Sequence, residues 1–330
     1  MKHEAIDFVI TWVDGNDPAW QQEKQKYTAG NADVRANRYR DWDQLQYWFR
    51  AVEKYAPWVN KIHFVTWGHV PEWLDVNNPK LNIVKHTDFI PQEYLPVFNS
   101  TAIEVHLHRI PGLSQQFVYF CDDYYLLQPC KPTDFFKNGK PVDMAELTPI
   151  QPHHEEMYYY HLYNDYSLYQ PYARYKLLLP QIFKFFNLKY GSIAFKNLMH
   201  IAAHNIYFRA RHVCIPLLKS TLETLWQMHG ERLEKTARSR FREMTNNSPY
   251  VFRGYQFVTG NFYPRKIKSI VLQTNNTVAT KKIIESGKYK FICLSDVSDV
   301  ESFASDKIAI NASFDKVFPE RCSFERQDKF

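Results

Sequence analysis

The feature that most constrains the fold is a run of apolar, β-branched and aromatic residues near the start of the chain. Residues Ile6 to Val13 read IDFVITWV, and the turn-forming sequence DGNDP follows at once. Such a run, stopped by Asp, Gly, Asn and Pro, predicts a strand that ends in a turn. Asp7 stands inside this strand, where a buried carboxylate needs either a partner or a role.

Further patterns alternate over the first 130 residues. Apolar residues recur at helical spacing over 41–57, and 101–110 reads as a short amphipathic helix. Strands are predicted at 61–66, 81–84 and 116–121. The order β, α, β, β, α, β favours an α/β fold with a mostly parallel, Rossmann-like sheet flanked by helices. Ligands of such sheets bind at the carboxyl ends of the strands.

The chain is expected to have three parts. Residues 1–143 form an α/β part, 144–263 a helix-rich insertion or lid, and 264–330 a C-terminal part whose strands rejoin the sheet. Within the later parts we expect helices over 182–200, 216–242 and 299–318, and strands over 267–272 and 289–294 that rejoin the sheet.

Composition excludes some classes of protein. Of the 330 residues, 45% are hydrophobic, so disordered and collagen-like architectures are ruled out. The net charge is +6, and the basic clusters lie at Arg35–Arg40 and Arg232–Arg242. Short, separate clusters favour phosphate-bearing ligands or an anionic membrane surface over nucleic acid.

The location follows from what the sequence lacks. No apolar run approaches the roughly 18 residues that a membrane span needs, and Met1–Glu4 is charged with no apolar signal region. The five cysteines are odd in number and include no C-x-x-C pair, which argues against disulfides and structural zinc. We therefore expect a cytoplasmic protein that at most associates peripherally with the inner face of the membrane.

The sharpest local feature is the acid pair Asp122-Asp123, directly after the apolar strand QFVYFC. Two carboxylates at the carboxyl end of a strand suit a hard cation such as Mg²⁺ or Mn²⁺ that also binds substrate phosphates. The alternative is that the acids end the strand through turn hydrogen bonds. The first strand ends in a similar acidic turn, at 14–17, so the two ends together predict a nucleotide-diphosphate site.

Four sets of segments stand out along nearly the whole chain. They are Ile6–Pro18, Arg38–Leu74 with Phe98–Asp123, Arg211–Trp226 with Arg238–Arg242, and Ile292–Asp296 with Phe318–Glu325. In this order they closely resemble the first to fourth conserved regions of the Stealth family of bacterial capsular and exopolysaccharide phosphotransferases, which are related to the animal N-acetylglucosamine-1-phosphotransferase.

The resemblance implies a GT-A-like sheet and a hexose-1-phosphate transferase of surface polysaccharide synthesis. It also implies that 1–143 is the nucleotide-sugar-binding part, that 144–263 is a lid over the acceptor and holds the third conserved region, and that 264–330 rejoins the catalytic core. The donor would be a UDP-sugar, either a UDP-N-acetylhexosamine or a UDP-hexose, and the acceptor a lipid-linked oligosaccharide or a growing polysaccharide, with release of UMP. Two alternatives stay open. One is a conventional glycosyltransferase that releases UDP, and the other is a non-catalytic carbohydrate-binding protein, for which the 16% aromatic residues would be sufficient reason.

The resemblance also implies roles for single residues. The catalytic residues would be His212, Arg242 and Asp123. The metal ligands would be Asp122, Asp123 and Asp296, with Mg²⁺ or Mn²⁺ as cofactor. The contacts to the nucleotide would come from Asp7, Thr11, Trp12, Asp14, Arg38 and Asp41.

Simpler explanations exist for some of these residues. Without the family, His212 is a lone histidine before an apolar helix, and Arg242 is a solvated charge at a helix end. Arg38 and Asp41 are close enough in sequence to pair only with each other.

Two tracts of the middle part invite functional readings. His153–Glu156 holds four residues of metal-binding types, but four consecutive side chains cannot all converge on one ion, so we interpret the tract as a polar loop on the acceptor side. Residues 157–175 hold many tyrosines, and we predict that they form a platform for the acceptor sugar.

Overall fold

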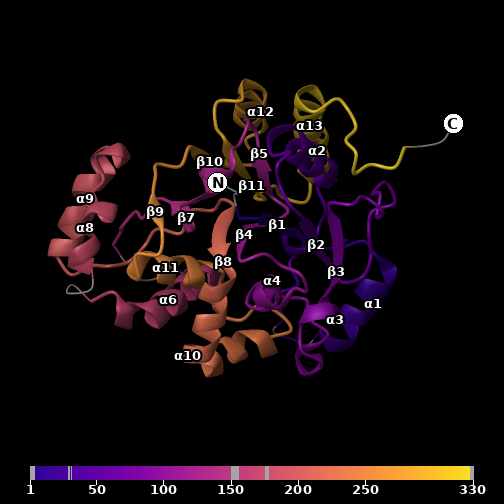
Figure 1. Ribbon diagram of the computed structural model, residues 1–330. Coiled ribbons are helices and arrows are strands. Elements are labelled where there is room, and N and C mark those ends of the chain that lie inside the picture. The colour runs from indigo at the N-terminus through magenta and orange to yellow at the C-terminus, as the bar shows by residue number, and fades with distance from the viewer. Residues whose placement is uncertain (1–3, 29, 31, 150–155, 175–177, 328–330) are drawn as a thin grey trace.

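The computed structural model describes residues 4–28, 30, 32–149, 156–174 and 178–327. At its centre is a five-stranded sheet in the order β3-β2-β1-β4-β8 (Figure 1). The strands are β1 (Ile6–Thr11), β2 (Ile62–Thr66), β3 (Leu81–Lys85), β4 (Gln116–Phe120) and β8 (Ile215–Leu218). The first four run parallel and β8 runs antiparallel to β4. The predicted mostly parallel α/β sheet is confirmed.

Helices cover both faces of this sheet. Successive side chains of β1 point to opposite faces of the sheet, and since most of them are apolar, both faces have to be covered. Phe8 and Ile10 pack in one core with aromatic residues of α2 (Leu45–Tyr55). Val9 faces the opposite core, which contains residues of α10 (Lys219–Arg238) and α11 (Tyr250–Val258). The apolar run at the start of the chain thus serves two cores at once.

A second sheet lies beside the first, in the order β10-β11-β5. β10 (Ser269–Gln273) and β11 (Phe291–Ser295) are parallel, and β5 (Tyr124–Leu126) is antiparallel to β11. The prediction that the two late strands rejoin the central sheet is therefore wrong. The chain turns sharply after β4, and the exposed edge of β5 offers β11 a partner outside the central sheet. The helices α12 (Thr277–Ser286) and α13 (Phe303–Val317) pack on each other next to this sheet.

Several short elements connect these layers. They are α1 (Pro18–Tyr27), α3 (His86–Phe89), α4 (Ser100–Glu104) and α5 (Pro132–Phe135), with a small sheet of β6 (Phe136–Lys137), β7 (Lys140–Asp143) and β9 (Tyr263–Pro264). Helix α1 was not predicted from the sequence, although Asp17 caps it by accepting from Trp20 N at 2.7 Å and Pro18 begins it.

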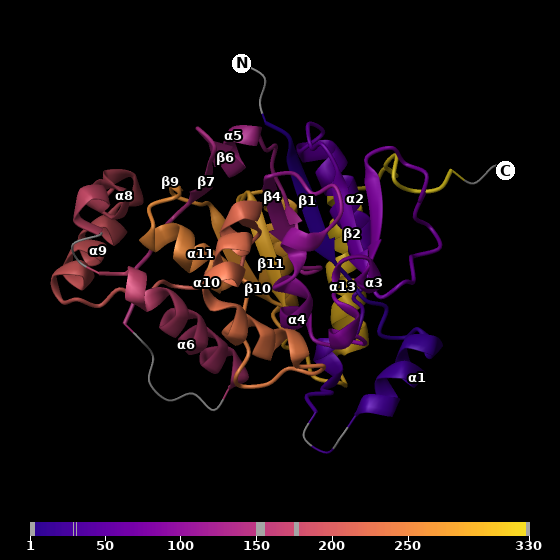
Figure 2. The same ribbon diagram turned by 60° about the horizontal axis from the view of Figure 1, so that its bottom comes forward.

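The middle part is rich in helices, as predicted. It contains α6 (Met157–Tyr169), α8 (Ile182–Phe185) and α9 (Ser192–Ala202), which stand at one side of the molecule (Figure 2). The predicted helix over 182–200 is interrupted. α8 ends at Phe185, and Gly191, with a φ of 66°, lies outside helical geometry directly before α9. The predicted helix over 216–242 begins instead as β8, whose four residues are all buried against β4.

The late parts of the chain share their core with the first part. Cys293, Phe314 and Phe324 belong to the same cluster as Phe8. The middle part has a smaller cluster of its own around Phe185. The division at 143 and 263 stays a prediction. Among the described residues, no helix is both long enough and apolar enough to cross a bilayer.

Candidate active site

A cleft of about 750 Å³ opens where β1 and β4 end. Because β8 is antiparallel to β4, it begins at this same edge, so His212, just ahead of β8, comes to lie beside the end of β4. β11 also ends here, since Leu294 N donates to Asp123 O at 2.9 Å. Segments far apart in the sequence therefore converge on the acid pair.

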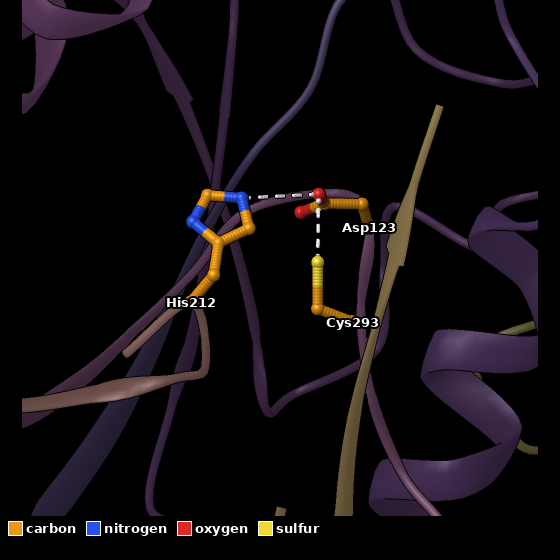
Figure 3. Close-up of side chains that lie close together, drawn as sticks. All are labelled: Asp123, His212 and Cys293. Atoms are coloured by element: carbon orange, nitrogen blue, oxygen red, sulfur yellow. Dashed lines mark hydrogen bonds and ion pairs between the residues drawn. The ribbon is translucent and has the colours of Figure 1, made fainter. Parts of the chain in front are cut away.

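The acid pair lies in the cleft, and Asp123 contacts two side chains. His212 Nε2 lies 3.5 Å from Asp123 Oδ2, and the Cys293 thiol donates to the same oxygen at 3.2 Å (Figure 3). Oδ1 of Asp123 is buried and has no hydrogen-bond partner among the described residues. Of the two carboxylate oxygens, one is thus occupied and one is left for a ligand.

Asp122 is open to the water of the cleft but surrounded by protein on its other sides. Burial, then the negative charges of Asp123 and Asp41, raise its pKa to about 8. Such crowding of like charges disfavours the ionised form unless a cation is present.

His212 is held by two tyrosines. Its Nδ1 lies 2.6 Å from Tyr250 OH and 3.0 Å from Tyr124 OH. When Nδ1 carries the ring proton and donates it to a tyrosine oxygen, the lone pair lies on Nε2, the atom that faces Asp123. The side chain is 39% exposed, so a substrate can reach it.

The donor atoms of Asp123, His212 and Cys293 lie within 4.8 Å of one another. Burial raises the pKa of the Cys293 thiol well above its usual value, so with no ion bound the thiol is an S–H donor to Asp123. The unpartnered oxygen of Asp123 and the crowded carboxylate of Asp122 are hard ligands. The unpartnered oxygen of Asp123 therefore fits a hard cation. That Asp122 shares this ion stays a prediction, because the group of donor atoms within 4.8 Å of one another contains Asp123, His212 and Cys293.

Two guanidinium groups face the cleft. Arg242 donates to Ser100 Oγ at 2.6 Å, and Arg38 donates from Nε to Asp33 at 3.1 Å. Burial and the nearby charge of Arg242 lower the pKa of Arg38, and Arg242 forms no ion pair within the described part of the chain. Two like charges this close suit an anion that bridges them.

The loop that carries Arg242 is held in place by buried hydrogen bonds to Asn99. Asn99 Nδ2 donates to Asn246 Oδ1 at 2.9 Å and to the carbonyls of Ser239 and Phe241. Asn99 and Asn246 are both fully buried, so this network fixes the loop relative to α4.

The end of β1 contributes Thr11 and Trp12 to the cleft. Thr11 Oγ1 lies 3.1 Å from Tyr119 OH, and Trp12 Nε1 donates to Asp41 Oδ2 at 3.2 Å. The possibility that Arg38 and Asp41 pair with each other is wrong, because each has another partner and both line the cleft.

Asp296 lies in the cleft, but Arg40 occupies both of its oxygens. Arg40 Nε donates to Oδ2 at 2.6 Å, Nη2 contacts Oδ1, and Nη2 also donates to Ser298 O. A carboxylate whose oxygens are both bound by an arginine is a poor metal ligand. The prediction that Asp296 binds the metal is therefore corrected.

Asp7 and Asp14 lie outside the residues that line the cleft. Asp7, at the far end of β1, is fully buried and accepts from Asn60 Nδ2 at 2.7 Å and Ser114 N at 2.8 Å, with His63 Nε2 at 3.1 Å. The prediction that Asp7 contacts the nucleotide is corrected: these three partners satisfy the carboxylate. Asp14 caps its own turn by accepting from Asn16 N.

Glu104, the last residue of α4, was not among the site residues predicted from the sequence. It is 4% exposed, accepts from Tyr119 OH at 2.7 Å, and borders the cleft. Its Oε2 has no partner among the described residues, and burial raises its pKa. The sequence did contain a signal for a functional role of Glu104. A glutamate stands on the apolar side of a short predicted helix, where charged residues are rarely found.

The tyrosine-rich tract is mostly the helix α6, whose first residues, Met157 and Tyr158, border the cleft. Of the polar tract His153–Glu156, the residues up to 155 lie outside the described part of the chain.

Comparison with known proteins supports the resemblance. Three stretches match the Stealth family: conserved region 1 over 4–32, region 2 over 38–143 and region 3 over 211–259. The second and third of these contain the acid pair, His212 and Arg242, so the clustered side chains come from separate conserved regions.

Relatives match over nearly their whole length. The chain is 40% identical to the capsular polysaccharide phosphotransferase WcwK of Streptococcus pneumoniae, over 97% of this chain and 99% of the relative. Identity is 39% to the receptor polysaccharide phosphotransferase WefC of Streptococcus oralis, with the same coverages. It is 36% to the exopolysaccharide phosphotransferase cps2G of Lactiplantibacillus plantarum, over 97% and 96%.

Among solved structures, the chain is similar to the galactosyltransferase LgtC in complex with donor and acceptor sugar analogues. The sequence identity is 10% and the TM-score 0.40, over 92% of this chain and 95% of the other.

Proposed function

The chain belongs to the Stealth family of polysaccharide phosphotransferases, and from this membership we propose that it transfers a hexose 1-phosphate from a UDP-sugar to a sugar hydroxyl. The acceptor oxygen bonds to the sugar-side phosphorus, and the bond from that phosphorus to the bridging oxygen breaks. UMP leaves with the electron pair, and the hydroxyl proton passes to a base. The product is a phosphodiester within a capsular or other surface polysaccharide.

One observation carries this proposal. The acid pair, His212 and Arg242 come from different conserved regions, yet all of them line a single cleft. Transfer to a hydroxyl of a phosphorus-bound group requires a base, positive charge around the diphosphate and close positioning more than covalent catalysis. Each of these requirements has a candidate side chain in the cleft.

We assign the base to His212. With Tyr250 and Tyr124 on Nδ1, the ring is fixed, and Nε2 is the atom exposed toward the acid pair. A neutral imidazole near pH 7 accepts a proton as the new O–P bond forms. Asp123 then stabilises the imidazolium through its nearby Oδ2.

The positive charge comes from two sources. Asp122 and Asp123 would hold Mg²⁺ or Mn²⁺, which neutralises charge on the diphosphate and the leaving UMP. Arg242 and Arg38 hold phosphate oxygens, since a guanidinium offers paired donors to them. Glu104, with one unpartnered buried oxygen, adds a further hydrogen-bonding group at the cleft floor.

The uridine side of the donor is assigned to the end of β1. Thr11 is bonded to Tyr119 and Trp12 to Asp41 there. Trp12 also stacks on Phe64 at 5.6 Å, which fixes its ring. The proposed location is the cytoplasm at the inner face of the membrane, supported by the net charge of +6.

The test is to identify the nucleotide product. Purified protein is given a panel of UDP-sugars, Mg²⁺ and an oligosaccharide acceptor, and we expect UMP and a phosphodiester-linked product. Release of UDP with a glycosidic bond would establish a conventional glycosyltransferase instead. Binding without turnover, unchanged by chelation or by Asp123→Asn, would establish a binding protein.

A further inference from the structure

The part of the chain from 178 to 205 forms an arm that carries α8 and α9. In both views the two helices stand at the outer side of the molecule, away from the central sheet (Figures 1 and 2). The arm leads directly into Arg209–His212, which line the cleft.

The helix α9 is held to the protein by a polar residue. Asn197 is fully buried: its Nδ2 donates to Ala145 O at 2.8 Å and Phe185 O at 2.9 Å, and its Oδ1 accepts from Leu147 N at 2.8 Å. These bonds determine which side of α9 faces the core.

The opposite side of α9 carries large apolar residues. Met199 is 73% exposed, Phe195 59% and Leu198 40%. Phe183 on α8 is 78% exposed, and Leu188 between the helices is 72% exposed. Single exposed apolar residues are ordinary, but a group of them on one short arm marks a surface that binds something.

The charge of this region indicates which kind of partner the arm binds. Between Asp165 and Glu223 the sequence has no Asp or Glu and eight Lys or Arg. In the arm, three exposed apolar residues are each followed by a lysine, as Phe183-Lys184, Leu188-Lys189 and Phe195-Lys196. Lys189 and Lys196 are exposed, whereas Lys184 turns back to the carbonyl of Gly260.

We propose that this arm binds an anionic lipid bilayer, with Phe183, Leu188 and Met199 entering the boundary between headgroups and acyl chains. Lysines beside them reach the phosphates while their stems stay in the apolar layer. Surfaces that bind other proteins are depleted in lysine at their centre, which favours lipid over a protein partner. The inference concerns binding alone and does not depend on the reaction assigned to the cleft.

The test uses the full chain and lipid vesicles in a sedimentation assay. We expect about tenfold stronger binding to phosphatidylcholine vesicles that contain phosphatidylglycerol than to pure phosphatidylcholine, because basic residues near an anionic surface add attraction. High salt should remove most of this difference. Equal binding to both kinds of vesicle, or binding to neither, overturns the proposal.

A triple variant tests the residues. Phe183→Ser, Leu188→Ser and Met199→Ser together should abolish vesicle binding. The matched control replaces Val278, Val300 and Ile308 by Ser, since these are 80%, 78% and 73% exposed outside the arm. Retained binding in the arm variant, or equal loss in the control, contradicts the assignment.

Lysine variants keep the test valid should the triple variant fail to fold. Lys189→Gln with Lys196→Gln should weaken binding to anionic vesicles about tenfold, with Lys282→Gln and Lys288→Gln as the control pair. If the arm variants instead change only the monomer–dimer equilibrium, with no vesicle binding in the unmodified protein, the surface is a protein contact and the proposal is wrong.

Discussion

Nε2 of His212 and Oδ2 of Asp123 lie 3.5 Å apart across the cleft. The two residues belong to different conserved regions and are brought together by the antiparallel pairing of β8 with β4. A candidate base and a candidate metal ligand are thus positioned by the same strand pair.

His212→Ala should lower kcat by roughly 10² to 10⁴, the usual contribution of a general base. The fold should persist, because the side chain is partly exposed and packs only at the cleft. Measuring UMP release and the melting temperature together checks both statements. His229→Ala, which removes a tyrosine-bonded histidine elsewhere, is the control, and a normal rate in the His212 variant would refute its role.

Tyr250→Phe should reduce kcat about tenfold and leave KM for the donor nearly unchanged. The hydroxyl lies 2.6 Å from Nδ1 of His212, the nitrogen away from Asp123, so we expect it to position the ring. The distinguishing measurement is a double mutant: in the His212→Ala background, Tyr250→Phe should have no further effect. An additive loss would mean that Tyr250 acts independently of His212.

The strands around this site could be predicted because they are apolar runs that end in acids, so Thr11 and Asp122 were placed correctly at one edge. The pairing of β11 with β5 could not be predicted, because β5 has only three residues and β11 lies far along the chain. The bond between Arg40 and Asp296 is equally non-local. Asp7 shows the reverse case, in which a motif residue proves to be a buried structural carboxylate.

Arg40→Ala and Asp296→Asn should each destabilise the protein by about 2 kcal/mol, since each leaves one largely buried charge without its partner. The side chains are 14% and 15% exposed. Denaturant unfolding of both single variants and the double variant should give a coupling energy of about 1 kcal/mol or more. If Asp296 were a metal ligand instead, only its own substitution would change the Mg²⁺ dependence of activity.

The protein should lose stability as the pH falls below 6.5. Burial lowers the pKa of His106 to about 3, from an ordinary value of 6.5. Between pH 6.5 and pH 3, His106 is protonated in the unfolded chain and neutral in the folded protein, so the free energy of unfolding falls as the pH falls. Stability from this residue is therefore complete above pH 6.5 and declines toward pH 3.

The variant His106→Phe tests this directly, because Phe can keep the stacking of His106 between Tyr94 and Trp226. The loss of unfolding free energy from pH 6.5 to pH 5 should be smaller in this variant by about 2 kcal/mol. His200→Phe on α9 is the control. An unchanged pH dependence in His106→Phe would show that its titration does not limit acid stability.

Tyr158→Ala and Tyr163→Ala should raise KM for the acceptor about fivefold without changing kcat, if α6 is the acceptor platform. Tyr158 is 39% exposed and borders the cleft, and Tyr163 is 57% exposed further along the same helix. Loss of one ring from a stacking surface costs about 1 kcal/mol, which corresponds to that factor. Tyr27→Ala, equally 39% exposed but on α1, should leave acceptor kinetics unchanged. An effect confined to kcat, or equal in the control, would remove α6 from acceptor binding and leave its tyrosines as surface packing.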